Sequence, residues 1–175
     1  QADVIILKYA QNLFGLDRAV VQKIKESNSE ISIELPESGQ ELILSADSLE
    51  NFNKIIFVGL PGLPQYEEIR ELVYRGLKRL KDITPYPRRV VLTLHGGGYG
   101  LDEKLAFREE LNGILDFLTI DSGRKVNEII FVERDGDTVN KLNSVLNRFL
   151  QENSDIVSSP LNYLNEITFK FLSDA

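Results

Sequence analysis

Apolar residues of this chain occur in two patterns, short continuous runs and long stripes with the period of a helix. The continuous runs are typical of buried strands and lie at residues 3–8, 54–60, 89–95 and 127–133. The stripes are typical of amphipathic helices and lie at residues 18–26, 65–82, 102–119 and 136–152. Strands and helices therefore alternate. This predicts an α/β fold, a three-layer α/β/α sandwich with a mainly parallel, mixed central sheet.

Two further regions have the alternating pattern of half-buried strands. Residues 30–35 and 40–45 flank the turn sequence 36–39 (PESG), and we interpret the pair as a β-hairpin. Residues 165–172 (NEITFKFL) alternate as well and predict a last strand at an edge of the sheet.

Composition narrows the class of protein. The 175 residues, of which 42% are hydrophobic, predict a single domain that covers residues 1–175. The net charge of −7 disfavours duplex nucleic acid as a partner, because a protein that binds it needs a basic face. The chain has no cysteine and a single histidine, so we expect no disulfide, no metal site and no cofactor.

The sequence has no apolar run near the ~18 residues of a membrane span and no secretion signal, so we expect a cytoplasmic protein without a membrane partner. The chain begins with Gln1 and contains no methionine. We therefore expect a module of a larger protein, whose other domains are among its partners.

The glycine cluster after the predicted strand 89–95 carries the strongest functional signal. Residues 95–100 (HGGGYG) follow the strand, and a predicted helix comes next. Glycines let the backbone approach a ligand closely, and the N–H groups of a loop and a helix start can bind phosphate. The alternative is a tight, crowded turn. His95 could donate to a phosphate or ribose, act as a general acid or base, or hydrogen-bond a neighbouring loop.

Parallel sheets bind their ligands beyond the carboxyl ends of the strands. The loops expected at this edge are residues 9–17, 59–66, 95–102 and 133–137. In the first of them we interpret Asp17 as the N-cap of helix 18–26, with a role as general base as the alternative. Asp135 and Asp137 would cap the helix from 136 or contact a ligand.

Three regions, in their order and spacing, resemble a macro domain, the module that binds ADP-ribose. They are residues 2–20, residues 54–60 together with Tyr74 and Arg75, and residues 92–100 (LTLHGGGYG) followed by strand 127–133. The likeness covers residues 2–152 and is shared with the N-terminal domain of leucine aminopeptidases. The resemblance implies the same three-layer fold.

The resemblance also implies a ligand site. Gly97 to Gly100 would wrap a diphosphate and its distal ribose, and Gly15 to Asp17 would form the opposite loop. Gln11 stands where many macro domains have an asparagine that orients the ribose. The candidate ligand-binding residues are therefore Gln11, Gly15, Leu16, Asp17, His95, Gly96, Gly97, Gly98, Tyr99 and Gly100.

Three functions compete. The first is a module that binds ADP-ribose or another diphosphate-containing nucleotide within a signalling or regulatory protein. The second is a scaffold or protein-interaction domain that has lost its ligand, which Gln11 and the single glycine at Gly15 favour. The third is an ADP-ribosyl hydrolase, for which only Gln11, Asp17 and His95 are available. We assign no catalytic residue.

Overall fold

The structure, a computed structural model, describes residues 2–13, 15–27, 32–46, 49–94, 100–120, 126–133, 135–154, 164 and 166–172. The strands of this part of the chain are β1 (Ala2–Tyr9), β2 (Glu41–Ser45), β3 (Phe52–Gly59), β4 (Arg89–Thr93), β5 (Glu128–Val132) and β6 (Thr168–Leu172). Its helices are α1 (Gly15–Ser27), α2 (Tyr66–Lys78), α3 (Glu103–Ile120) and α4 (Gly136–Ser154), and a 3-10 turn, η1 (Arg79–Asp82), extends α2. The predicted α/β fold class is confirmed.

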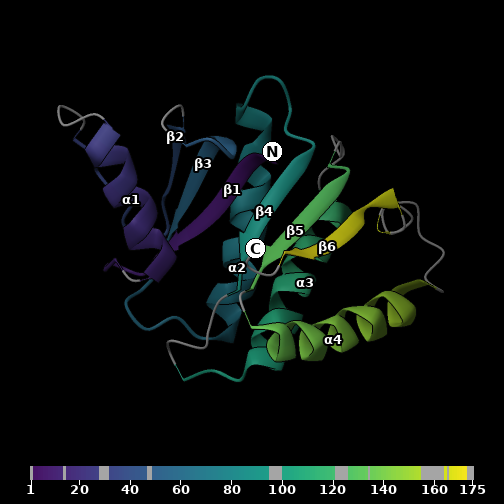
Figure 1. Cartoon of the computed structure of the whole chain (residues 1–175). Coiled ribbons are helices and arrows are strands. Elements are labelled where there is room, and N and C mark those ends of the chain that lie inside the picture. Colours follow the sequence, from purple (N-terminus) through teal and green to yellow (C-terminus); the bar gives the residue numbers. More distant parts are fainter. Residues whose placement is uncertain are drawn as a thin grey trace.

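All six strands belong to one sheet, in the order β2-β3-β1-β4-β5-β6 (Figure 1). Neighbouring strands are parallel except for β2, which runs antiparallel to β3. In the register of the sheet, Ile5 of β1 lies opposite Ile55 of β3 and Val91 of β4. The predicted mixed, mainly parallel sheet is therefore confirmed, and β1 lies in its interior.

The sheet separates two apolar cores. Successive side chains of a strand point to opposite faces, and those of β1 are apolar on both. Val4 and Ile6 belong to the core that α2, α3 and α4 cover, whereas Ile5 and Leu7 belong to the core that α1 covers. None of these four side chains is more than 2% exposed. Helices on both faces of one sheet make the three layers that the sequence predicts.

Two aspartates cap the helices that follow β4 and β5. A carboxylate oxygen of Asp102 accepts the N–H of Leu105 at 3.0 Å, at the start of α3. Asp135 accepts both the N–H and the hydroxyl of Thr138, at 3.0 and 2.6 Å, at the start of α4. These hydrogen bonds from Thr138 lower the pKa of Asp135, because they favour its charged form. The predicted cap at Asp135 is confirmed.

The predicted hairpin between residues 30–35 and 40–45 is wrong. Residues 32–37 form no strand, and β2 pairs instead with β3, where Ile43 lies opposite Ile56. Backbone hydrogen bonds hold the preceding turn against the end of β3: Gly39 N–H donates to the Gly59 carbonyl at 3.1 Å. The buried strand β3 offers a larger apolar surface than residues 32–35. Packing against β3 therefore determines the partner of β2, although the turn sequence 36–39 favours a hairpin.

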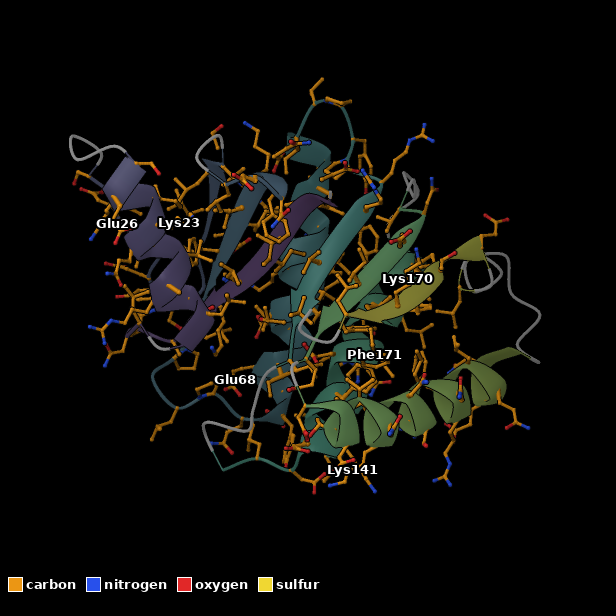
Figure 2. All side chains as sticks on the ribbon, in the orientation of Figure 1. Lys23, Glu26, Glu68, Lys141, Lys170 and Phe171 are labelled. Atoms are coloured by element: carbon orange, nitrogen blue, oxygen red, sulfur yellow. The ribbon has the colours of Figure 1, made fainter. Side chains whose placement is uncertain are left out.

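The last strand, β6, lies at the edge of the sheet, as the alternation predicts. The ring centroid of Phe171 lies 5.6 Å from that of Phe107 in α3 and 5.4 Å from that of Phe131 in β5. Lys170 points to the other face, where its Nζ lies 3.2 Å from a carboxylate oxygen of Glu128 (Figure 2). Phe171 therefore packs β6 against the core, and Lys170 makes the opposite face of β6 polar.

Helices α2 and α3 approach each other closely at a glycine. A Cβ on Gly113 of α3 would lie 2.5 Å from the carbonyl oxygen of Arg70 and 2.9 Å from the Cβ of Val73, both in α2. The Arg70 oxygen belongs to a helical backbone, which cannot yield as a flexible side chain can. Only glycine fits here without moving a helix.

Replacing Gly113 with alanine should therefore lower the free energy of unfolding by about 1–3 kcal/mol through overpacking. This loss should appear although alanine is the better helix former by about 1 kcal/mol. Gly136→Ala in α4 is the matched control, because a Cβ there would have no neighbour within 4 Å among the residues that the structure describes. Urea unfolding of the two variants measures the difference. If both variants were as stable as the parent chain, the close approach of α2 and α3 would be refuted.

Candidate functional site

The chain leaves the neighbouring strands β1 and β4 toward opposite faces of the sheet. The helix after β1 is α1, on one face, and the helix after β4 is α3, on the other. The two connections diverge at the carboxyl ends of the strands, which leaves a crevice between them. Open parallel sheets bind their ligands at such switch points.

A hollow of about 490 Å³ lies at this switch point. Its walls come from the start of α1 and from the ends of β4 and β5: Gly15, Leu16, Ala19, Thr93, Leu94, Val132 and Glu133. Two candidate ligand-binding residues, Gly15 and Leu16, thus lie opposite the end of the strand that precedes the glycine cluster. The hollow combines apolar side chains with one carboxylate.

The start of α1 offers an anion-binding wall. Gly15 has a φ of 48°, and no atom of the described residues lies within 4 Å of where its Cβ would be. Glycine adopts this left-handed conformation without strain, and it also leaves the helix start uncovered. The first N–H groups of a helix have no carbonyl partner within the helix, and they form the positive end of its dipole. This wall is therefore suited to a phosphate or carboxylate.

Asp17 is not the N-cap of α1, so that interpretation is wrong. The helix begins at Gly15, which puts Asp17 inside the first turn, where its carboxylate lies 2.7 Å from the Nζ of Lys8. Both side chains are largely buried, at 5% exposed for Asp17 and 15% for Lys8. Burial raises the pKa of Asp17, while the charge and hydrogen bond of Lys8 oppose that rise. The ion pair fastens the end of β1 to the start of α1.

A second buried acid, Glu110 of α3, interacts electrostatically with Lys8. It is 0% exposed in α3, and burial raises its pKa well above the ordinary value of 4.5. The positive charge of Lys8 opposes this rise. Lys8 is thus electrostatically coupled to one acid from each face of the sheet.

Sequence reasoning missed Glu110, although its position carried a signal. The buried stripe of α3 includes Phe107, Leu111 and Ile114. Glu110 lies within this stripe, three residues after Phe107 and directly before Leu111. A carboxylate at a core position of an amphipathic helix is rarely buried without a partner. Lys8 carried a similar signal, as a charge at the end of an apolar strand.

Gln11 lies away from the hollow, on the β3 side of β1. Its φ is 60°, and its side-chain amide donates to the carbonyl of Leu60 at 3.0 Å and to that of Pro36 at 3.3 Å. These bonds join the loop after β1 to the loop after β3 and to the segment that precedes β2. The structure therefore does not bring Gln11 together with Gly15 and Leu16 at the hollow.

The remaining candidates belong to the glycine cluster. His95, Gly96, Gly97, Gly98 and Tyr99 lie outside the described residues, so their ligand contacts stay predictions. Gly100 is exposed with a φ of 74°, and within the described part of the chain no atom lies within 4 Å of where its Cβ would be.

Comparison with known proteins does not assign the chain to a family. No family model matches the chain, and no curated protein matches its sequence. The fold and the site thus define a class only: an α/β domain with a six-stranded, mostly parallel sheet and a hollow at its switch point. Among the described residues, no helix is long and apolar enough to cross a membrane. The same residues contain no group of three or more His, Cys, Asp or Glu side chains placed to hold a metal ion.

The buried Glu110 should make the stability of the fold depend on pH. Because its folded pKa is raised above 4.5, the folded chain binds more protons than the unfolded chain at pH values between 4.5 and that raised pKa. The free energy of unfolding should therefore fall as pH rises through this window. Glu110→Gln stays neutral at every pH and should remove up to about 1.4 kcal/mol per pH unit of this slope.

Urea unfolding from about pH 4 to about pH 8 measures the slope. Glu71→Gln, at an exposed position of α2, is the control and should keep the slope of the parent chain. Asp17 contributes a slope of the same sign, because its pKa is also raised, and that part should remain in both variants. Identical slopes in the parent chain and Glu110→Gln would show that Glu110 is not protonated preferentially in the fold.

Proposed function

We propose that this domain binds ADP-ribose or another diphosphate-containing nucleotide at the carboxyl edge of the sheet, as a module of a larger signalling or regulatory protein. The observation that carries the proposal is the 490 Å³ hollow between the start of α1 and the ends of β4 and β5. Its volume falls in the range of small-molecule sites, and its position is that of ligands in open parallel sheets.

The chemistry of the walls supports a nucleotide. A diphosphate would face the N–H groups at the start of α1. Leu16, Leu94 and Val132 supply apolar surface for a base. The carboxylate of Glu133 can accept hydrogen bonds from ribose hydroxyls, and it is held in place by the N–H of Asp135 at 3.0 Å.

The ion pair beside the hollow supports an anionic ligand. An unpaired carboxylate in the first turn of α1 would repel a phosphate bound at that helix start. Lys8, 2.7 Å from Asp17, offsets this negative charge. The helix dipole can then act on a bound anion without opposition from an unpaired Asp17.

Thermal unfolding with ADP-ribose tests the proposal. A ligand at about 100 times its Kd adds roughly 2.7 kcal/mol, which is a rise in Tm of about 5–10 °C for a chain of this size. Ala19→Trp should abolish the rise, because Ala19 is exposed in α1 and its side chain lines the hollow. Gln22→Trp, at an exposed position of the same helix outside the hollow, should keep it.

Three results would count against the proposal. A Tm unchanged by millimolar ADP-ribose, ADP or inorganic pyrophosphate would reject a diphosphate site. An equal rise in Ala19→Trp and the parent chain would move the ligand to another place. Loss of the rise in Gln22→Trp as well would mean that any bulky change in α1 has the same effect.

A domain that keeps the fold without the ligand is the second candidate, and Gln11 favours it. At the position where the resemblance implies a ribose-orienting amide, the side chain is used to join two loops. Absence of any Tm rise, together with a correctly folded chain, would support this interaction domain over the nucleotide-binding module.

A further inference from the structure

A second hollow lies on the outer surface of the domain, between α3 and α4. Its volume is about 260 Å³, and it shares no residue with the hollow at the switch point. Residues of both helices line it: Lys104, Leu105, Arg108, Lys141, Ser144, Val145 and Arg148. We refer to these seven residues as the α3–α4 groove.

Four of the seven side chains of the α3–α4 groove are basic, and none is acidic. Lys104 and Arg108 are four residues apart on α3, so they share one side of that helix. Lys141 and Arg148 are seven residues apart, which sets them two turns apart on one side of α4, about 10 Å along its axis. In a chain with a net charge of −7, this is a strong local concentration of positive charge.

Most of these charges are available for a partner. Within the described part of the chain, Lys104, Lys141 and Arg148 form no ion pair. Arg108 pairs with Glu152 of α4, but the two side chains are 40% and 46% exposed, so the pair is weak and exchangeable. Asp102 and Glu103 line an adjoining hollow with Lys104 and Lys141, and Lys141 also interacts electrostatically with Asp135, so acidic side chains border the groove on this side.

The α3–α4 groove also has an apolar centre. Leu105 is 54% exposed, although large apolar side chains usually avoid water. Val145 of α4 lies in the same lining and is half-buried. A ring of positive charges around exposed apolar atoms matches a partner that has both carboxylates and an apolar side chain.

We propose that the α3–α4 groove is a docking surface for an acidic, amphipathic peptide segment of a partner protein. Its carboxylates would pair with Lys141 and Arg148 on α4 and with Lys104 on α3, and one apolar side chain would cover Leu105. The two-turn spacing of Lys141 and Arg148 fits a short helix with acidic residues at matching intervals. This proposal does not rest on the proposed nucleotide site.

Charge and apolar surface together favour a peptide over other anions. A nucleic acid or an anionic membrane would bring a long run of negative charge against a chain that is itself acidic. Neither inorganic phosphate nor a phosphate backbone would cover the exposed leucine. A peptide confines its charge to the groove and buries the apolar centre.

Selection from a random 12-residue peptide library displayed on phage tests the proposal. The parent chain should enrich sequences that combine several Asp or Glu residues with a Leu, Ile or Phe. A synthetic peptide of the enriched sequence should bind at micromolar Kd, and binding should weaken as salt rises. Lys141→Glu/Arg148→Glu should weaken it at least about tenfold, since like charges then face each other.

The matched control is Lys23→Glu/Lys25→Glu on α1, which changes the net charge by the same amount at exposed positions (Figure 2 labels Lys23 on α1 and Lys141 on α4). This variant should bind the peptide as the parent chain does. If Lys141→Glu/Arg148→Glu does not fold, as judged by circular dichroism, Lys104→Glu on α3 replaces it, and the single variant Lys23→Glu on α1 is then the charge-matched control.

The proposal is overturned if the library yields no enriched sequence, or if the enriched sequences are not acidic. It is also overturned if the charge-reversed and control variants bind the peptide equally. Binding of oligo(dT) or of phosphatidylserine vesicles that depends on Lys141 and Arg148, without an enriched acidic peptide, would assign the groove to those partners instead.

Discussion

The complete burial of the middle of β1, from Val4 to Leu7, is the constraint on which the other layers depend. The strand pairs with β3 along one edge and β4 along the other, and its middle side chains face a core on each side. Helix α2 packs so closely on β1 that a side chain larger than that of glycine does not fit between them: a Cβ on Gly76 of α2 would lie 2.6 Å from the Cγ2 of Ile6. Each face must therefore supply apolar surface shaped to this strand, α1 on one side and α2 with its neighbours on the other.

This burial confines polar chemistry to the end of the strand. Lys8 is the first charged residue after the apolar middle of β1, and its ion pair with Asp17 and its coupling to Glu110 lie there. The hollow occupies the same carboxyl edge, because that is where the chain leaves β1 and β4 toward opposite faces. The position of the candidate site thus follows from the topology, whereas its chemistry depends on the side chains at these strand ends.

The sequence predicted most of the architecture for a physical reason. A strand covered on both faces must be apolar throughout, and a helix covered on one side must repeat its apolar residues with helical period. The partner of β2 could not be predicted in this way, since it depends on which surface offers more burial. The N-cap role predicted for Asp17 was wrong, and the hydrogen bonds of Gln11 could not be predicted, because the fold brings their partners, Lys8 and Leu60, from other parts of the chain. Glu110 could have been found from its place in the inner stripe of α3.

The helices on the two faces of the sheet bury different numbers of apolar side chains. Helix α1 buries three apolar side chains, Val20, Val21 and Ile24, whereas α3 buries Ala106, Phe107, Leu111, Ile114, Phe117 and Leu118. Local opening costs less free energy where fewer apolar contacts must be broken, so the backbone amides of α1 should exchange with solvent more readily than those of α3. Helix α1 is also a wall of the hollow, so a ligand there would tighten the least firmly attached layer of the domain. Occupancy of the hollow and order in α1 would then be thermodynamically linked, so that a bound ligand would be detectable as slower amide exchange in one helix.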